Sequence, residues 1–496
     1  MKKTVPVFLT LCLALLLAAC GGGGGGGNTP AAPPAGLGVT PLSAPRIEPY
    51  EQGTTRALAK SGASLDAALV PGPLVRLGAL SPDALAGVAV AQSFQGGRNT
   101  PRQIGLNRAL VATATAAATM GLLQWTALPG GGSATAVSFR AEGAAAVRLA
   151  LSVERLPAEA VVRVYAPAGG EVVALTGSQI LASLASQAGN GPRPTGATLF
   201  WLPTVSGDAA TLELALPAGA DPASVAVAVP SLSHLWVDLA SPKAQAQLKL
   251  ASSSCNVDAT CMADWSTPSR SVARMMFVSG ASAYLCTGTL MADVAGSGTP
   301  WLLSANHCIS DQVSASTLET YWFYRATACN SGALNPGATR VFGGATLLYT
   351  SAASDTSFMR LNSAVPTGAY FAGSLLAAPP LDVPIAGLHH PGGDLLKFSQ
   401  GALVGYAACS GVNCTPQSSS TGADYLTVRW TAGTTESGSS GSAVFTPVGA
   451  GQYVTGHLFA GLASCTTPDS PDYYGRFDVA YRAALHQYLG EVAGAR

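Results

Sequence analysis

The distribution of cysteines constrains this chain more than any other feature. Of its 10 cysteines, two lie at residues 12 and 20, and no other occurs before residue 255. The remaining eight form an even set: Cys255, Cys261, Cys286, Cys308, Cys329, Cys409, Cys414 and Cys465. An even set is typical of disulfides formed in an oxidising compartment. The asymmetry predicts a cysteine-free region over 46–249 and a disulfide-bonded domain over 250–496.

The N-terminus predicts export. Two lysines at positions 2 and 3 precede an apolar run from Val5 to Ala19, which is too short for a membrane span of roughly 20 residues. Leu17-Ala18-Ala19-Cys20 resembles a bacterial lipobox, which implies a lipid on Cys20. An ordinary signal with cleavage after small residues is the alternative. We therefore expect a signal over 1–20, a Gly/Pro-rich linker over 21–45, and a cell-envelope lipoprotein or a secreted protein.

The charge balance limits the classes of partner that the chain is expected to bind. The formal net charge is +0 and charged residues make up 10% of the chain, so no basic face indicates nucleic acid. No second apolar run is long and uniform enough for a transmembrane helix. We expect membrane contact only through the lipid at Cys20, with protein or peptide substrates as partners and a monomeric state.

Alternating strands dominate the cysteine-free region from Ala109 onward. Five segments alternate apolar with small or polar residues, and Gly, Pro and Asp separate them: 137–140, 147–153, 161–165, 211–216 and 225–229. This spacing favours an antiparallel β-sandwich, with a helix over 178–187. Before Gln103 the pattern is mixed. His234 stands alone, and Trp201 is interpreted as a core residue. The region is interpreted as a pro-region, or as a glycan- or protein-binding module.

Three short strings in the second half carry candidate chemistry. Ser440 lies in Gly438-Ser439-Ser440-Gly441, where small residues leave a serine hydroxyl accessible to a substrate carbonyl. His307 follows the apolar run 301–305 and precedes Cys308, and Asp355 leads into the apolar run 356–361. A flexible Gly/Ser loop, a zinc-binding histidine and a turn aspartate are the respective alternatives. No metal-ligand spacing or calcium loop accompanies the histidine, so no metal or other cofactor is expected.

The order His307, Asp355, Ser440 is that of chymotrypsin-like proteases. Residues 255 to about 488 resemble bacterial lysyl endopeptidases of that class. The resemblance rests on strings that occur in the same order: 255–261, 286–308, 355–358, 389–391, 438–442 and 472–476. It implies an all-β fold in which two β-barrels follow the N-terminal sandwich.

The resemblance also implies roles. Ser440 would be the nucleophile, His307 the general base and Asp355 its orienting carboxylate, with the N–H groups of Gly438 and Ser440 as the oxyanion hole. It implies three disulfides: Cys255–Cys465, Cys261–Cys329 and Cys286–Cys308. Cys409 and Cys414 remain, and their closeness predicts a local fourth bond. Ser439 replaces the aspartate with which trypsin-like enzymes capture a new N-terminus, so activation needs another route.

Substrate preference depends on Asp472. In the family this aspartate lies at the base of the specificity pocket, which implies cleavage after Lys or Arg; an exposed turn is the alternative. Phe459 replaces a histidine that the lysine-specific members carry, and Tyr406 is a possible substitute for their tryptophan. The strict choice of lysine is therefore open.

The chain also contains a possible processing site. Family members mature by cleavage after a lysine shortly before the first cysteine, which predicts self-processing at Lys249-Leu250, with Lys243 as a lesser site. Two other functions compete with a basic-specific endopeptidase. They are a serine protease of different specificity and a catalytically weak, protease-like binding protein at the cell surface.

Overall fold

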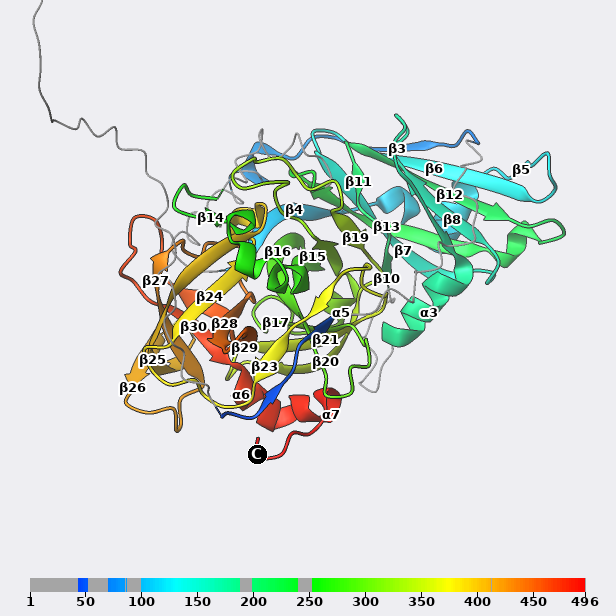
Figure 1. Ribbon diagram of the computed structural model, residues 1–496. Helices are drawn as coiled ribbons and strands as arrows, with labels where there is room; N and C mark the ends of the chain where they lie inside the picture. The colour runs from blue at the N-terminus through cyan, green and yellow to red at the C-terminus, as the bar shows by residue number, and fades with distance from the viewer. Residues whose placement is uncertain are drawn as a thin grey trace, which may run out of the picture. The chain divides into compact units, whose positions relative to one another are not determined.

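The computed structural model describes residues 43–51, 70–84, 86, 100–187, 199–239, 252–411 and 413–495. The expected signal, Cys20, Lys243 and the Lys249-Leu250 bond lie outside these ranges. Strands dominate the described chain (Figure 1). None of the helices in the described ranges is both long and apolar enough to cross a membrane.

Residues 102–235 form the expected β-sandwich, together with one short strand upstream. One layer contains strands in the order β3 (Leu74–Leu77), β6 (Ser133–Ala141), β12 (Ala209–Leu216), β8 (Val161–Tyr165) and β9 (Val172–Thr176), with β5 (Thr126–Ala127) on β6. The other contains β10 (Leu199–Trp201), β7 (Ala146–Arg155), β13 (Ala226–Leu235) and β4 (Arg102–Ala109), with β11 (Val205–Ser206) on β7. Phe139, Leu149, Val162 and Val227 are fully buried in one hydrophobic cluster between the layers. The helix expected over 178–187 is confirmed as α3 (Gly177–Gln187), and α2 spans Ala116–Leu122.

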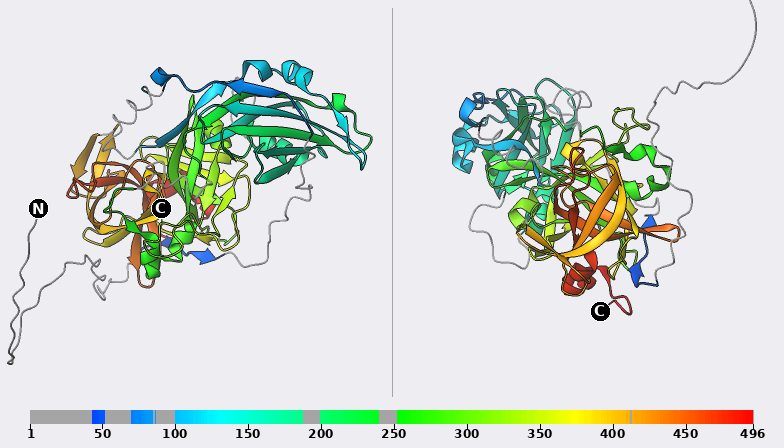
Figure 2. Two further views of the ribbon diagram at one scale, coloured as in Figure 1. Left: turned by 90° about the horizontal axis from the view of Figure 1, so that it is seen from above. Right: turned by 90° about the vertical axis from the view of Figure 1, so that its left-hand side faces the viewer.

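The sandwich is not separate from the cysteine-bearing half. Strand β4 pairs with β13 on one side and with β16 (Ser282–Met291) on the other, so one 12-stranded sheet spans both halves. The order in this sheet is β13, β4, β16 and β15. The left view of Figure 2 shows the two halves side by side. The poor pattern before residue 103 concealed this connection.

The first set of strands in the cysteine-bearing half is an open, curved sheet. Strand β16 pairs with β15 (Val272–Ser279) and with β17 (Trp301–Ala305). The sheet continues from β15 through β18 (Glu319–Trp322) to β19 (Thr339–Val341), and from β17 through β21 (Thr356–Leu361) to β20 (Ala345–Ser351). No pairing between β19 and β20 closes it in the part of the chain that the structure describes. The short helix α5 (Gln312–Ser316) lies beside β20.

The second set closes into a six-stranded barrel. Its order is β29 (Gly451–Gly461), β28 (Ala443–Val448), β24 (Pro384–His389), β25 (Lys397–Ser410), β27 (Tyr425–Ala432) and β30 (Asp472–Arg476), and β30 pairs back with β29. Strand β26 (Asn413–Gln417) forms a hairpin with β25, β14 (Val257–Asp258) also pairs with β25, and α6 (Phe477–Ala480) and α7 (His486–Leu489) end the chain. Of the two expected barrels, closure is therefore found in one.

The segment 46–51 also differs from expectation. Although it begins the region assigned to the N-terminal domain, β1 (Arg46–Ile47) pairs with β23 (Gly373–Leu375), and β2 (Tyr50–Glu51) pairs with β22 (Tyr370–Phe371). The Tyr50 ring stacks on Phe371 with centroids 4.7 Å apart. Main-chain pairing with a strand edge requires no distinctive residues, so the sequence carried no signal for this docking.

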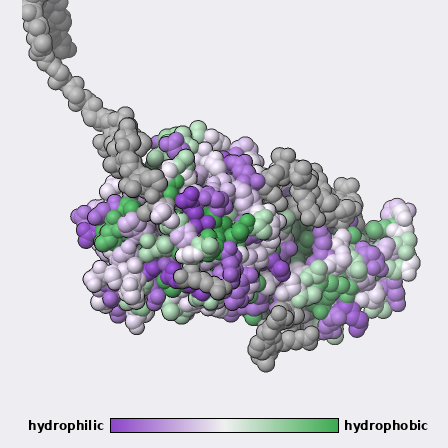
Figure 3. All heavy atoms as spheres, turned by 60° about the horizontal axis from the view of Figure 1, so that its bottom comes forward, coloured by the Kyte–Doolittle hydropathy of each residue, from purple (hydrophilic) through white to green (hydrophobic). Residues whose placement is uncertain are grey.

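Four disulfides cross-link residues within the cysteine-bearing half. They are Cys255–Cys465, Cys261–Cys329, Cys286–Cys308 and Cys409–Cys414, the same pairs that the sequence and the resemblance implied. Elsewhere the surface is mixed: Figure 3 shows hydrophilic and hydrophobic residues interspersed over the face in view.

Candidate active site

His307 is positioned by the end of β17. Leu302 and Leu303 bury this strand in the core, so the chain emerges at Asn306 beside β21. The backbone N–H of Asn306 donates to the Asp355 carbonyl oxygen at 2.8 Å. The next residue, Cys308, is bonded to Cys286 on β16. The histidine therefore lies on a short turn held at both sides.

Asp355 binds His307 through both carboxylate oxygens. One oxygen accepts the His307 backbone N–H at 2.9 Å, and the other lies 2.7 Å from Nδ1. A carboxylate only accepts, so Nδ1 carries the proton and Nε2 is left as a base. Asp355 is 2% exposed and its φ is 50°, a backbone region that non-glycine residues rarely occupy.

A further histidine, which is fully buried, contacts the backbone of this aspartate. His457 lies on β29, and its Nε2 is 3.1 Å from the carbonyl oxygens of Ser354 and Asp355. Those oxygens can only accept, so the ring donates from Nε2. Burial, the largest effect, lowers the pKa of His457, and the neutral ring holds the strained backbone in place.

Ser440 is brought next to this turn by the loop before β28. Its carbonyl oxygen accepts the Thr287 N–H at 2.9 Å. Gly441 follows with φ +78°, and a Cβ there would lie 2.2 Å from Ser304 Oγ, so only glycine permits this approach. Ser440 Oγ and His307 Nε2 are both buried, and neither has a hydrogen-bond partner among the described residues. They are a hydroxyl and a ring nitrogen available to each other or to a substrate.

Ser439 is held by a histidine. Its Oγ lies 2.8 Å from His389 Nδ1 and accepts the Glu436 N–H at 3.1 Å, while His389 Nε2 lies 2.9 Å from Ser399 Oγ. Burial, followed by the charge of Lys397, lowers the pKa of His389 to about 3, so the ring is neutral. The residue before Ser440 is thus fixed by neutral hydrogen bonds.

Glu436 fixes the start of the same loop. One of its carboxylate oxygens accepts the Ser253 N–H at 2.8 Å and the Asn256 side-chain amide at 2.6 Å. Residues on both sides of Cys255 are therefore bound to the loop that carries Ser440.

The N–H of Gly438, which the resemblance assigns to an oxyanion hole, has a hydrogen-bond partner in the N-terminal region. Gly438 has φ +95°, and its N–H donates to the Thr100 carbonyl oxygen at 3.0 Å. The Ser437 hydroxyl donates to the same oxygen at 3.0 Å.

Asp472 begins β30 and is fully buried, so its interpretation as an exposed turn residue is wrong. One carboxylate oxygen accepts the Trp430 indole N–H at 2.7 Å and the Thr435 hydroxyl at 2.6 Å. A Cβ at Gly461 would lie 1.8 Å from the other oxygen. Hydrogen bonds from neutral donors such as these stabilise the charged form of a carboxylate.

Phe459 lies between the histidine turn and the barrel. Its ring centroid is 6.2 Å from that of His307 and 5.0 Å from that of Tyr425. Tyr425 is thus its aromatic partner. Tyr406, the substitute considered from sequence, instead donates its hydroxyl to the Pro379 carbonyl oxygen at 2.6 Å.

Sequence reasoning missed most of this supporting shell. It named the string around His389 without a role, and it gave no role to His457, Tyr425, Glu436 or Thr100. A histidine in an apolar strand gives no indication of its partner. The other candidates resolve as structural residues: Trp201 is 6% exposed, and His234 is buried 3.5 Å from Arg108.

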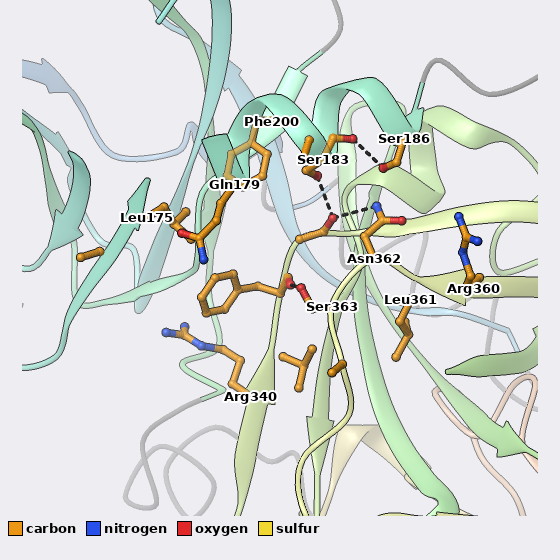
Figure 4. A pocket seen from close by; sticks show the side chains of 16 residues that line it. Leu175, Gln179, Ser183, Ser186, Phe200, Arg340, Arg360, Leu361, Asn362 and Ser363 are labelled. Atoms are coloured by element: carbon orange, nitrogen blue, oxygen red, sulfur yellow. Dashed lines mark hydrogen bonds between the residues drawn. The ribbon is translucent and has the colours of Figure 1, made fainter. Parts of the chain in front are cut away.

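A cavity of about 600 Å³ lies where α3 faces β19 and the end of β21, and His307, Asp355 and Ser440 are not among its lining residues (Figure 4). Ser183 and Asn362 both donate to the Gly343 carbonyl oxygen at 3.0 Å along its wall. The described residues contain no group of three or more His, Cys, Asp or Glu side chains that could hold a metal ion.

Comparisons with known proteins identify a family. The family model "Lysyl endopeptidase, C-terminal domain" matches residues 250–475, and "Lysyl endopeptidase N-terminal domain" matches residues 76–236. A lysyl endopeptidase from Pseudomonas aeruginosa is 32% identical over 400 residues, covering 77% of this chain and 80% of the relative.

Solved protease structures also match, at low similarity. The Rv3671c protease of M. tuberculosis in its active form has a TM-score of 0.32 and 13% identity, with 48% of this chain and 88% of that chain covered. A thermostable serine protease, AL20, from an extremophilic microorganism has a TM-score of 0.30 and 14% identity, with 45% and 97% covered. Both scores are below 0.5, so neither decides the fold.

The molecule is a serine protease of the chymotrypsin-like class. Two family models and a relative that matches most of the chain define it more closely. The chain belongs to the lysyl endopeptidase family.

Proposed function

We propose that this protein is an exported endopeptidase that cleaves proteins after lysine or arginine, with Ser440 as nucleophile, His307 as base and Asp355 as orienting carboxylate. The observation that carries the proposal is the contact of both Asp355 carboxylate oxygens with His307, which places a proton on Nδ1 and turns Nε2 away from the carboxylate. Among the described residues, neither this Nε2 nor the Ser440 hydroxyl has a hydrogen-bond partner. Geometry of this kind prepares a base to accept the serine proton.

The reaction follows from these groups. Ser440 Oγ attacks the scissile carbonyl while its proton moves to His307 Nε2. The resulting oxyanion accepts hydrogen bonds from the N–H groups of Gly438 and Ser440. The imidazolium then gives its proton to the leaving amine, and an acyl-enzyme remains on Ser440. Water, deprotonated by the same ring, hydrolyses that ester. Asp355 stabilises the imidazolium in both halves of the cycle.

Asp472 would set the preference for basic residues. A carboxylate held by Trp430 and Thr435 inside the barrel offers a negative charge in a poorly solvated place, where pairing with a cationic side chain is strongly discriminating. Phe459, which packs on Tyr425, lies beside His307 where the lysine-specific members carry a histidine. We therefore expect both lysine and arginine to be accepted.

Maturation and location complete the proposal. The C-terminal family model begins to match at residue 250, which supports cleavage of Lys249-Leu250 and a pro-region role for 46–249. The four disulfides support export. A lipid at Cys20 would tether the uncleaved chain to the cell envelope.

One experiment tests catalysis and maturation together. The chain without its signal is expressed as wild type and as Ser440→Ala, and the amino termini are read by mass spectrometry. We expect wild type to begin at Leu250 and the variant to remain uncut. A wild type that starts elsewhere would refute the processing site, and a variant cut at the same bond would refute self-processing.

A further inference from the structure

The serine loop is already assembled in the uncleaved chain. Ser439 is held by His389, and Glu436 is held by Ser253 and Asn256. None of these contacts requires a new amino terminus. Keeping an uncleaved protease inactive must therefore depend on access to the site and not on the shape of the loop.

The N-terminal region reaches the catalytic residues at one point. The Thr100 carbonyl oxygen accepts from Gly438 N–H and from Ser437 Oγ, both at 3.0 Å. A carbonyl oxygen that accepts the Gly438 N–H stands where the substrate's scissile carbonyl would bind. A Cβ built on Gly438 would lie 3.5 Å from Arg102 Cβ, so the following residues also cross the loop. Ser440 beneath them is 0% exposed.

The next residues continue as an extended strand along β16. Arg102 pairs with Leu285 and Gln103 with Tyr284, and Gln103 Nε2 donates to Ser282 Oγ at 2.9 Å. Leu285 precedes Cys286, whose disulfide holds the residue after His307. A substrate whose scissile carbonyl binds at Gly438 must place the residues after the scissile bond, its leaving-group side, along this strand edge. Strand edges bind extended peptides by main-chain pairing.

Two residues make the Thr100–Pro101 bond a poor substrate. Threonine offers no cation to Asp472. Proline has no N–H, and its ring carbon lies where an ordinary peptide carries hydrogen, so the ring crowds the nitrogen that His307 must protonate.

We propose that residues 100–103 occupy the active site as a substrate-like but uncleavable segment, with the Thr100 carbonyl in the position of the scissile carbonyl and residues 101–103 on the leaving-group side. The edge of β16 over 282–285 is then the binding site for the leaving-group side of true substrates. This rests on the proposed function of Ser440. The N-terminal region then inhibits by occupying the site, and its removal opens both the oxyanion hole and the strand edge.

Converting the segment into a substrate tests the proposal. Full-length chains carrying Thr100→Lys alone and Thr100→Lys with Pro101→Ala are compared, each with and without Ser440→Ala. We expect a new amino terminus at residue 101 in the double variant, at least about tenfold faster than with Thr100→Lys alone, and none with Ser440→Ala. The rate should not depend on protein concentration, because the bond is bound within its own chain.

Three results would overturn it. They are no cut at residue 101 by a protein that still cleaves lysyl peptides, equal cutting whether or not Pro101 is present, or a rate that rises with protein concentration. The last result would show an accessible loop and not a segment seated in the site.

A second arm does not depend on catalysis. In the Ser440→Ala chain, Gln103→Cys with Tyr284→Cys should cross-link under mild oxidation, since the two residues are opposite each other. Gln103→Cys with Ala283→Cys is the control, because adjacent strand residues face opposite sides. Failure of the first pair refutes the seating of the segment. If that pair does cross-link while the wild-type protein hydrolyses no lysyl peptide and reacts with no fluorophosphonate, the proposed function fails instead.

Discussion

The two halves of the protease domain differ in how they are completed. The second half closes on itself, because β30 returns to β29 and every barrel strand has two neighbours. The first half remains open and borrows β4 from the N-terminal region at its β16 edge. The closed barrel carries Asp472, and the open sheet carries His307 and Asp355. The Ser440 loop precedes β28 of the closed barrel. In the proposed function, the nucleophile and the specificity residue therefore lie on a self-sufficient scaffold, while the base and its carboxylate lie on a sheet that the N-terminal region extends.

The largest effect should come from the open sheet. Asp355→Asn keeps the shape but removes the charge that selects the His307 tautomer, so we expect kcat to fall about 10⁴-fold with little change in KM. The loss should be equal for lysyl, arginyl and neutral esters. The variant is matured with an immobilised lysine-specific protease, which is filtered off before assay. A loss confined to basic substrates would contradict the division of roles.

The interface between the halves is tested by a buried arginine. Arg148 on β7 is 1% exposed and donates to the Thr317 carbonyl oxygen at 2.6 Å and to the Leu202 carbonyl oxygen at 2.8 Å. Nearby, Glu319 accepts from the Thr204 N–H and hydroxyl. Arg148→Met should lower the free energy of unfolding of the uncleaved Ser440→Ala chain by about 3 kcal/mol, because it leaves buried acceptors unpaired.

The matched control for that variant is Arg163→Met. Arg163 binds Glu213 at 2.8 Å inside the sandwich, away from β16. We expect both variants to lower the urea concentration at the midpoint of unfolding. Only Arg148→Met should increase the protease sensitivity of β4, the strand that joins the halves. If Arg163→Met does so equally, the two halves unfold as one unit and the contrast between them fails.

Specificity should depend on the closed barrel. Asp472→Asn removes the negative charge but keeps the side-chain volume, so kcat/KM for a lysyl ester should fall about 10²-fold. A leucyl ester should be cleaved no more slowly than by wild type. Asp469→Asn, in the exposed turn just upstream, is the control and should change neither rate. An equal loss on both esters would mean that Asp472 serves folding and not selectivity.

The same contrast explains what the sequence could reveal. Strand alternation predicted the sandwich, and the order of three short strings led to the family. The pairing of β4 with β16 joins distant parts of the chain, as the 179 residues between Gln103 and Ser282 show, and it consists largely of main-chain contacts, which leave no local pattern. His389 and His457 were likewise unassigned, because a buried histidine acquires its role only from the neighbours that folding supplies.

The smallest effect per step of the measurement concerns acid stability, which changes gradually with pH. Burial lowers the pKa of His389 in the barrel to about 3 and that of His234 on β13 to about 4. The unfolded chain takes up a proton near pH 6.5, but the folded ring does so only at these lower values. Stability is therefore lost as pH falls, by about 1.4 kcal/mol per pH unit for each ring.

Substituting each ring separates the two regions. His389→Gln should flatten the pH dependence of the unfolding free energy of the Ser440→Ala chain from about pH 6.5 down to about pH 3, and His234→Gln only to about pH 4. Urea unfolding at unit pH intervals measures both. A slope unchanged by His389→Gln would mean that this ring is protonated in the fold. Ser439 would then be held by a charged partner, as trypsin-like enzymes hold theirs, and not by a neutral one.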